Sequence, residues 1–237
     1  MRALNDPALV RDQYADEADL RARKAAYANA EGPDARELAF QAVAEAAPTR
    51  VLEVGGGEGE LAERIVRELG AELVFVDQSP RLVELAAARG LDAQVGDVQD
   101  LPFPDASFDC AVAAWMLYHV PDVPRGLAEL ARVLRPGGRL VAVTNGAGHL
   151  AELRELAGHR AFWTGMPFAR ENGPELLGAS FAHVEARDAD GWVSFPDDDA
   201  IWAYLRSLSS ADPPASLPPH DLPFRVRREP TIFVATK

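Results

Sequence analysis

Short aliphatic and β-branched runs alternate with longer amphipathic stretches through the middle of the chain. Five such runs predict strands, at 51–54, 73–76, 91–95, 108–114 and 140–144. Between most of them, apolar residues recur at helical spacing and mark one side of each helix. Strands that alternate with helices pack as right-handed βαβ units, so the pattern predicts an α/β fold with a parallel sheet and helices on both faces.

Capping residues define several of the helix ends. The helix expected over 60–69 stops at Gly70, and the next helix begins at the N-cap Ser79. A further helix along 127–134 is expected to end at Pro136-Gly137-Gly138.

The two ends of the chain differ from this middle part. Residues 8–46 are rich in Ala, Glu, Arg and Leu and predict two helices, which we interpret as an N-terminal helical cap. After residue 145, aromatic residues and prolines become frequent, and runs at 181–186, 191–195 and 231–235 predict further strands. We interpret this last part as the far edge of the sheet together with a lid.

Composition narrows the possible partners. The 237 residues carry 37 Asp and Glu against 24 Lys and Arg, a net charge of -13. Binding to a phosphate backbone needs clustered cations, so a nucleic-acid partner is not expected. The single cysteine, Cys110, excludes an internal disulfide framework, and the longest apolar run, 111–118, is far too short to span a membrane. With no recognisable leader, we expect a cytoplasmic protein, either monomeric or homodimeric.

A glycine-rich turn joins the first strand to its helix. Four glycines, including Gly55, Gly57 and Gly59, fall within five positions between 51–54 and the helix that begins near Glu60. Such a turn lets the backbone approach a ligand at the carboxyl end of a strand. A flexible tight turn without a ligand is the alternative interpretation.

Two ligand classes remain possible for this turn. Read from Gly57, the glycines fit the relaxed dinucleotide fingerprint, with Asp77 18 residues after Gly59 as the ribose-binding acid, so an NAD(P)-dependent oxidoreductase is one hypothesis. However, a pyrophosphate here would meet Glu53, Glu58 and Glu60, and these like charges would oppose its binding. A ligand that carries positive charge and no phosphate fits better, and S-adenosylmethionine is such a ligand.

Five ordered motifs extend this pattern over roughly residues 50–145. They are Glu53-x-Gly55-x-Gly57-x-Gly59, the run 74–79 that contains Asp77, the run 96–109 that contains Asp97, the segment 117–122 and the segment 132–138. In this order the chain resembles the class I S-adenosylmethionine-dependent methyltransferases, and in particular the small-molecule branch of the ubiquinone and menaquinone biosynthesis enzymes. The resemblance implies a Rossmann-like, doubly wound and mostly parallel seven-stranded sheet with an antiparallel C-terminal edge strand. It also implies a single domain with a helical cap (1–47), a cofactor-binding core (48–145) and an acceptor-side lid (146–237).

The resemblance assigns cofactor contacts to particular residues. Asp77 is expected to bind both ribose hydroxyls with its two carboxylate oxygens. The alternative role for Asp77 is to cap the next helix, but Ser79 already serves as that cap. Asp97 and the Val98 amide are expected to bind the adenine, the alternative for Asp97 being a solvated turn. Glu53 is expected to orient the methionine end of the cofactor. The set is completed by Gln78 beside Asp77, the backbone near Ala114, Tyr14 and Arg23. Tyr14 and Arg23 resemble residues that close over the cofactor in some relatives. The alternative is that they belong to an amphipathic helix with an ordinary surface arginine.

Methyl transfer is an in-line displacement that depends mainly on positioning, and a general base is needed only when the acceptor loses a proton. His119, just past the strand at 108–114, is the candidate base, with a structural histidine as its alternative. The five histidines show no metal-ligand spacing, so no metal is expected. The segment Ala114-Trp115-Met116-Leu117 lacks the motif of amino-methylating DNA enzymes, so a small organic acceptor is expected. A non-catalytic cofactor-binding sensor stays the third hypothesis, beside the methyltransferase and the oxidoreductase.

Overall fold

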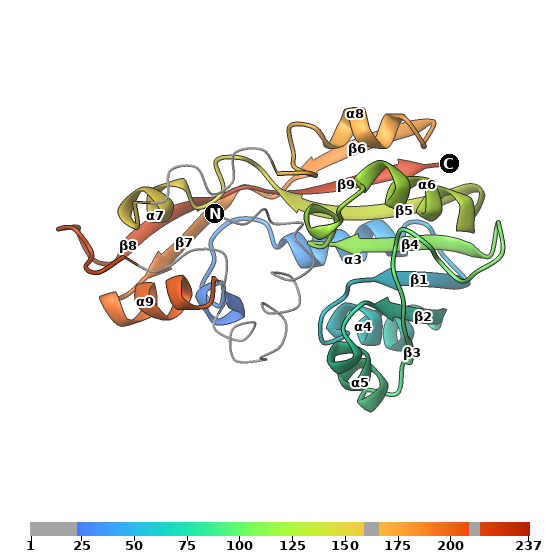
Figure 1. The fold of residues 1–237 in the computed structure, drawn as a ribbon, viewed down its shortest axis with the longest axis horizontal. Helices are drawn as coiled ribbons and strands as arrows, with labels where there is room; N and C mark the ends of the chain where they lie inside the picture. The colour runs from blue at the N-terminus through green and yellow to red at the C-terminus, as the bar shows by residue number, and fades with distance from the viewer. Residues whose placement is uncertain (1–22, 159–165, 209–213) are drawn as a thin grey trace.

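The computed structural model describes residues 23–158, 166–208 and 214–237. The elements run in the order α3 (Ala35–Ala44), β1 (Arg50–Val54), α4 (Glu60–Leu69), β2 (Glu72–Asp77), α5 (Pro80–Ala88), β3 (Asp92–Val95), β4 (Phe108–Ala114), η1 (Leu117–His119), α6 (Val123–Val133), β5 (Leu134–Asn145), α7 (Ala151–Leu156), α8 (Gly173–Gly178), β6 (His183–Asp188), β7 (Gly191–Phe195), α9 (Asp198–Arg206), β8 (Phe224–Arg228) and β9 (Pro230–Thr236). Figure 1 shows the large sheet and its helices at the right of the view. A smaller unit of α7, β7, β8 and α9 projects from it to the left.

The large sheet confirms the predicted fold class. Its seven strands follow the order β3-β2-β1-β4-β5-β9-β6, and β1 to β5 pair in parallel. The C-terminal strand β9 is antiparallel to β5 as expected, but its predicted edge position was wrong. β9 is inserted between β5 and β6, because its run of apolar residues is buried on both faces, whereas the exposed residues of β6 suit an edge.

The local signals explain most of the boundaries. Gly59 and Gly70, both with left-handed backbone, are the N-cap and C-cap of α4. Ser79 caps α5 by accepting a hydrogen bond from the Leu82 amide. The end of α6 differs from the prediction. The helix stops at Val133, and β5 starts at once with Leu134, because Leu134 is already extended and pairs with Phe108 across an irregular register. The proline and glycines after Leu134 therefore lie within β5.

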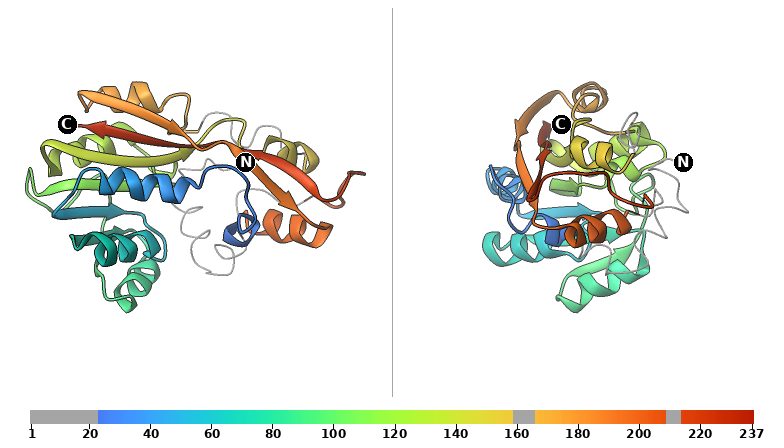
Figure 2. Two further views of the ribbon diagram at one scale, coloured as in Figure 1. Left: turned by 180° about the vertical axis from the view of Figure 1, so that it is seen from behind. Right: turned by 90° about the vertical axis from the view of Figure 1, so that its left-hand side faces the viewer.

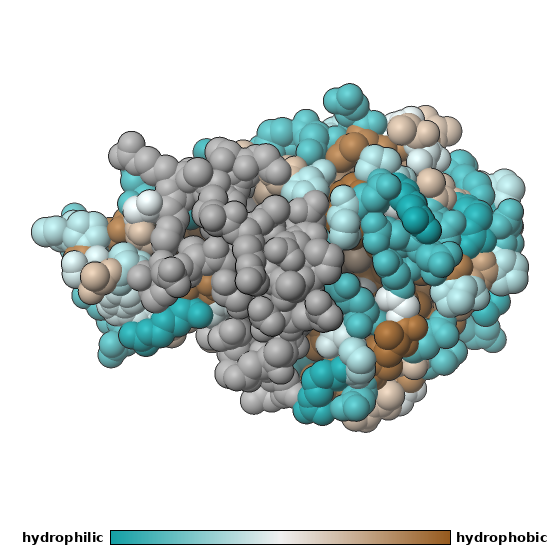
Figure 3. All heavy atoms as spheres, in the orientation of Figure 1, coloured by the Kyte–Doolittle hydropathy of each residue, from teal (hydrophilic) through white to brown (hydrophobic). Residues whose placement is uncertain are grey.

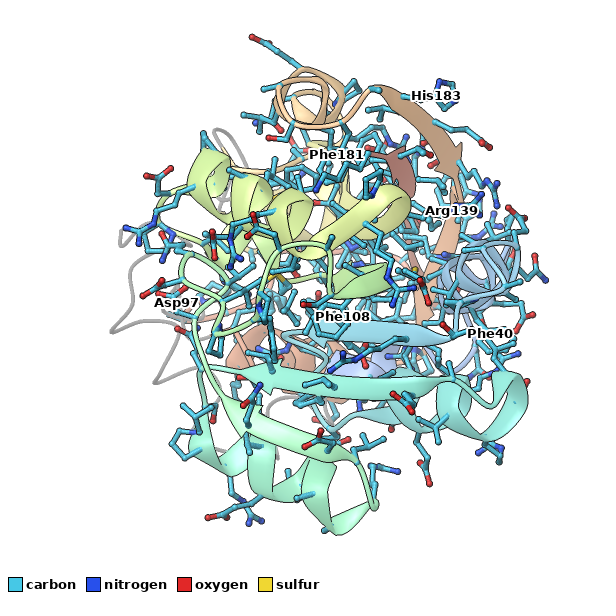
Figure 4. All side chains as sticks on the ribbon, turned by 90° about the vertical axis from the view of Figure 1, so that its right-hand side faces the viewer. Phe40, Asp97, Phe108, Arg139, Phe181 and His183 are labelled. Atoms are coloured by element: carbon cyan, nitrogen blue, oxygen red, sulfur yellow. The ribbon has the colours of Figure 1, made fainter. Side chains whose placement is uncertain are left out.

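The helices form two layers, each with its own apolar cluster against one face of the sheet. α6 and α8 pack on one face around Phe108, Leu127 and Phe233. α3, α4 and α5 contribute to the cluster on the other face, which includes Ile65 and Val141. Figures 2 and 4 show α3 on the opposite side of the sheet from α6, and Phe40 of α3 is labelled in Figure 4. α3, the part of the predicted cap that the structure describes as a helix, thus packs against β5 and β9.

The smaller unit is an extension of the sheet edge. β6 pairs with β9 and β7 pairs with β8, and both antiparallel ladders keep one register, so 183–195 and 224–236 form one long two-stranded ribbon with a break near Ala189 and Glu229. The predicted strand 191–195 was confirmed, but it belongs to this second sheet and not to the edge of the first. A third apolar cluster beneath the ribbon joins α7, α9 and residues 26–30.

The surface of the described residues is mainly hydrophilic on the face that Figure 3 shows. In the view of Figure 3, hydrophobic side chains of the described residues occur as scattered patches among polar ones. Large exposed hydrophobic residues are few and dispersed, for example Val95 and Leu222. Among the residues that the structure describes, no helix is long and apolar enough to cross a membrane.

Candidate active site

A cavity of about 1360 Å³ lies between the carboxyl ends of the central strands and the smaller unit. Its lining comes from the ends of β1, β2 and β4, from the loop after β3, from residues 23–36, from the segment after β5, and from α9 and β8 of the smaller unit. Ligands of open α/β sheets bind at this end of the strands, where the strand order reverses between β1 and β4. The cavity therefore occupies the position where a cofactor is expected.

The glycine turn forms one wall of the cavity. Gly55 and Gly57 adopt positive φ values of 64° and 61°, which favour glycine, and a Cβ on Gly55 would lie 2.7 Å from the Cβ of Met116. Gly56, which the sequence analysis left out of the site, also lines the cavity, and a Cβ there would collide with the Glu53 carboxyl group. Gly59 is not among the residues that line the cavity. It serves as the N-cap of α4, packed so closely against Leu91 that a side chain would not fit.

Glu53 is a buried acid at the end of β1. Its side chain is only 1% exposed, and Oε2 has no hydrogen-bond partner among the described residues. Burial raises the pKa of Glu53 to about 8. The negative charge of Asp77 adds to this rise, and a backbone hydrogen bond from Ala62 limits it. An orphaned buried carboxyl oxygen in a cavity wall favours a cationic or hydrogen-bond-donating ligand.

Asp77 ends β2 and is only 7% exposed. Its Oδ1 accepts from the Ser79 amide at 2.8 Å, and Ser79 is indeed the cap of α5. Burial raises the pKa of Asp77 to about 6, and the bond from Ser79 limits the rise. Asp77 therefore keeps acceptor capacity for a ligand, and the exposed Gln78 lies beside it in the cavity lining.

Asp97 and Val98 follow β3, and both line the cavity. The Asp97 carboxylate is exposed and accepts from the Gln99 amide at 2.9 Å. Figure 4 places the labelled Asp97 in the loop at the edge of the molecule. Ala114, the last residue of β4, also lies in the cavity lining, so the structure brings the ends of three neighbouring strands to one ligand site.

Residues 23–33, which we name the N-terminal strap, run along another side of the cavity. Lys24 pairs with Glu58 at 2.6 Å and with Glu60 at 3.0 Å. These two acids are therefore partly neutralised, which weakens the like-charge argument against a phosphate ligand at this turn. Arg23 lines the cavity and donates to the Ser207 carbonyl at 2.8 Å. Tyr14 lies outside the described residues.

His119 lies in the cavity wall at the end of η1. It is 8% exposed and its ring packs edge-on against Tyr118 with centroids 4.5 Å apart. Among the described residues no group of three or more His, Cys, Asp or Glu has a geometry that could hold a metal ion.

A polar group at the far end of the cavity was not anticipated. Tyr27, His149 and Tyr204 come from the strap, the segment after β5 and α9, and they converge in the lining. Their positions are 122 and 55 residues apart in the sequence, so no local motif could reveal them, and only the packing of the smaller unit brings them together.

Comparison with known proteins identifies the domain. Residues 52–142 match the model of a family described as "Methyltransferase domain", and the match covers the glycine turn, Asp77, Asp97 and His119. Residues 52–142 are thus similar to a methyltransferase domain. The oxidoreductase hypothesis thus loses its support. The acidic character of the site fits S-adenosylmethionine, because Glu53 and Asp77 offer buried carboxyl oxygens to a ligand with ammonium, sulfonium and ribose hydroxyl groups.

Curated relatives of this methyltransferase domain resemble the chain over part of their length. A demethylmenaquinone methyltransferase of Thermus thermophilus is 39% identical over 115 residues, which are 46% of this chain and 52% of the relative. A 2-phytyl-1,4-naphtoquinone methyltransferase of Synechococcus elongatus is 40% identical over 100 residues, covering 38% and 43%. The chain thus spans about half the length of the curated relatives it matches.

Solved structures of methyltransferases share the fold over nearly the whole chain. A phosphoethanolamine N-methyltransferase of Haemonchus contortus superposes with a TM-score of 0.65 at 19% identity, covering 100% of this chain and 61% of the other. A putative sarcosine dimethylglycine methyltransferase of Galdieria sulphuraria gives 0.61 at 13% identity, covering 93% and 98%. At these identities the likeness shows the fold and not the acceptor.

Proposed function

We propose that the protein is an S-adenosylmethionine-dependent methyltransferase that acts on a small organic molecule. The observation that carries the proposal is the pair of buried carboxyl groups, Glu53 and Asp77, at the ends of two adjacent strands beside a glycine turn. Relatives named as quinone methyltransferases support a small acceptor, as does the negative net charge of -13, which disfavours nucleic acid.

The residues of the chain have distinct parts in this proposal. S-adenosylmethionine supplies, when bound, a methyl group activated by its sulfonium. Asp77 holds the ribose hydroxyls, Glu53 faces the methionine end, and Asp97 with the Val98 amide borders the adenine. Enclosure by the strap excludes water and orients acceptor and donor in line, which is the main source of rate for a displacement.

Replacing Asp77 with alanine tests the cofactor assignment. We expect the dissociation constant of S-adenosylhomocysteine, measured by calorimetric titration, to rise by roughly 5- to 150-fold, because losing a charged acceptor of the ribose costs about 1–3 kcal/mol. Asp92→Ala, at the exposed start of β3, is the matched control and should leave the affinity unchanged. Equal affinity in a folded Asp77→Ala protein, or tight binding of NAD by the unaltered one, would contradict the proposal.

His119 is proposed as the general base for an acceptor that loses a proton. We expect His119→Ala to lower turnover by about 10²–10⁴-fold while the affinity for S-adenosylhomocysteine stays the same, because the side chain acts on the acceptor and not on the cofactor. Single-turnover rates with the acceptor found by screening would measure this. A fully active variant would mean that positioning alone carries the reaction and that the histidine is structural.

We also propose a cytoplasmic location for this activity. The support is that Cys110 is the single cysteine, so the chain holds no internal disulfide of the kind that is typical of oxidising compartments.

A further inference from the structure

Arg228 of β8 is a buried cation in the wall of the cavity. It is 5% exposed, and its guanidinium donates to the backbone carbonyl oxygens of Glu31, Pro33 and Ala189, which are all neutral. The carboxylates of Glu31 and Asp190 pair with other arginines, and among the described residues Arg228 has no ion pair with an acid. Because a buried charge without a counter-charge is costly, Arg228 favours an anion in the cavity.

The guanidinium of Arg228 also keeps one donor. An arginine has five N–H groups, and the bonds to the three carbonyl oxygens use the one on Nε, both on Nη2 and one on Nη1. The second N–H of Nη1 has no acceptor among the residues that the structure describes. Arg228 therefore offers a ligand both a positive charge and a hydrogen bond.

The residues that follow Arg228 hold two further polar side chains at the same wall. The Glu229 N–H donates to His149 Nδ1 at 3.0 Å. Pro230, the next residue, is paired with Asn145 at the end of β5. Arg228, His149, Pro230 and Asn145 all line the cavity, so one short segment of the ribbon brings an arginine, a histidine and an asparagine together.

His149 orients the hydroxyl group of Tyr27. Because His149 Nδ1 accepts from an amide, the neutral ring carries its proton on Nε2, which lies 2.9 Å from Tyr27 Oη. Burial, with the charges of nearby arginines that include Arg228, lowers the pKa of His149 to about 3, so the ring stays neutral. Tyr27 Oη thus accepts from His149 and keeps its own proton, because burial holds the pKa of Tyr27 well above its usual value. Tyr27 lines the cavity and is therefore a neutral donor beside Arg228.

Asn145 is a second neutral donor of this wall. Its Oδ1 accepts from Trp115 Nε1 at 3.3 Å. Because an indole N–H can only donate, this bond fixes the oxygen toward Trp115 and turns Nδ2 away from it. Asn145 is 6% exposed in the cavity lining, and no described residue accepts from Nδ2.

We propose that Arg228, Tyr27 and Asn145, which we name the basic wall, are the binding subsite for a carboxylate group of the methyl acceptor. This inference rests on the proposed function and names its substrate class. The basic wall combines one uncompensated positive charge with two neutral donors, which match a single negative charge spread over two oxygens. A phenolate offers only one oxygen, a phosphate dianion carries twice the charge that Arg228 balances, and an ammonium group would be repelled.

Three fluorinated probes of similar shape test this requirement: 4-fluorobenzoate, its neutral amide 4-fluorobenzamide, and 4-fluorophenyl phosphate. Fluorine NMR titration of the full-length protein, saturated with S-adenosylhomocysteine, measures the dissociation constant of each probe. We expect 4-fluorobenzoate to bind about tenfold more tightly than the amide, because only the carboxylate gains charge-assisted bonds to Arg228. It should also bind more tightly than the phosphate and should not displace S-adenosylhomocysteine.

Variants of the basic wall locate the carboxylate. Tyr27→Phe removes one hydroxyl and should weaken the binding of 4-fluorobenzoate by about 3- to 10-fold. Arg228→Met should remove the tenfold preference over the amide, whereas Arg228→Lys keeps the charge and should retain part of it. Arg225→Met, which removes an exposed arginine of the same strand outside the cavity lining, is the matched control and should keep the full preference. If Arg228→Met does not fold, Tyr27→Phe and the three probes still decide the question.

The outcomes separate this inference from the proposed function. Equal affinity for the carboxylate and the amide, tighter binding of the phosphate, or an unchanged preference in a folded Arg228→Met protein would overturn the carboxylate subsite alone. Displacement of S-adenosylhomocysteine by 4-fluorobenzoate would also overturn it, because the basic wall would then hold the carboxylate of the cofactor. If S-adenosylhomocysteine does not bind at all, the proposed function fails and the subsite fails with it.

Discussion

Replacing Gly191 with alanine is expected to release the N-terminal strap from the ribbon and to lower the free energy of unfolding by about 2–4 kcal/mol. The backbones of the strap and of β7 cross here so closely that a Cβ on Gly191 would lie 1.9 Å from the Glu31 carbonyl oxygen. That oxygen accepts from the Trp192 amide at 3.1 Å and from Arg228 Nη2 at 3.0 Å. Both bonds must break if the strap moves away, which leaves a buried guanidinium short of an acceptor.

Urea unfolding monitored by tryptophan fluorescence measures this loss, and limited trypsin digestion at Arg23 and Lys24 reports release of the strap. Gly178→Ala is the matched control, since a Cβ on Gly178 of α8 would meet nothing within 4 Å. Gly191 does not have positive φ, so a loss in Gly191→Ala comes from the crossing and not from backbone strain. Equal stability of the two variants would show that the strap is not clamped at this point.

A strong pH dependence of cofactor affinity is the second large effect that we expect. The pKa values of Asp77 and Glu53 are raised to about 6 and about 8 by burial, whereas a cationic ligand prefers both groups ionised. Affinity for S-adenosylmethionine should therefore rise with pH through this range, by up to about tenfold per pH unit, and level off above the pKa of Glu53. Glu53→Gln should remove the part of the rise that lies nearest pH 8.

The stability of the ligand-free protein should change in the opposite direction. The folded state holds a proton on Glu53 up to a pH of about 8, whereas the unfolded chain releases it near 4.5, so the contribution of this group to folding falls as the pH rises between these values. Thermal unfolding of the unaltered protein and of Glu53→Gln from pH 5 to 8 measures the difference. Parallel pH profiles of the two proteins would show that Glu53 ionises normally.

The regular part of the fold was predictable because its signals are local. α4, β4 and β7 were predicted at their observed bounds, since each is a short periodic segment between residues that end it, such as Gly70. β8 was missed, because Phe-Arg-Val-Arg-Arg carries three arginines and pairs only with a distant strand. The place of β9 beside β5 also depends on contacts that no local pattern contains.

The cofactor half of the site was predictable for the same reason. Glu53 and Asp77 lie at the ends of β1 and β2, and Asp97 follows β3. The ends of these strands are visible in the sequence, and parallel strands bring them together. The acceptor half was not predictable, because Tyr27 and His149 meet only after the strap has crossed the ribbon.

The shared register of the two ladders in the ribbon limits how the acceptor end can diverge. Val193 and Phe195 face the third apolar cluster, whereas Trp192 faces outward, so inserting one residue near Ala189 would exchange the two faces of everything beyond it. Changes of length at 214–223, beyond the ladder and outside α9, carry no such penalty. Divergent copies of this domain should therefore vary in length at the tip of the ribbon and keep its base, so that new acceptors can be accommodated while the cofactor end stays the same.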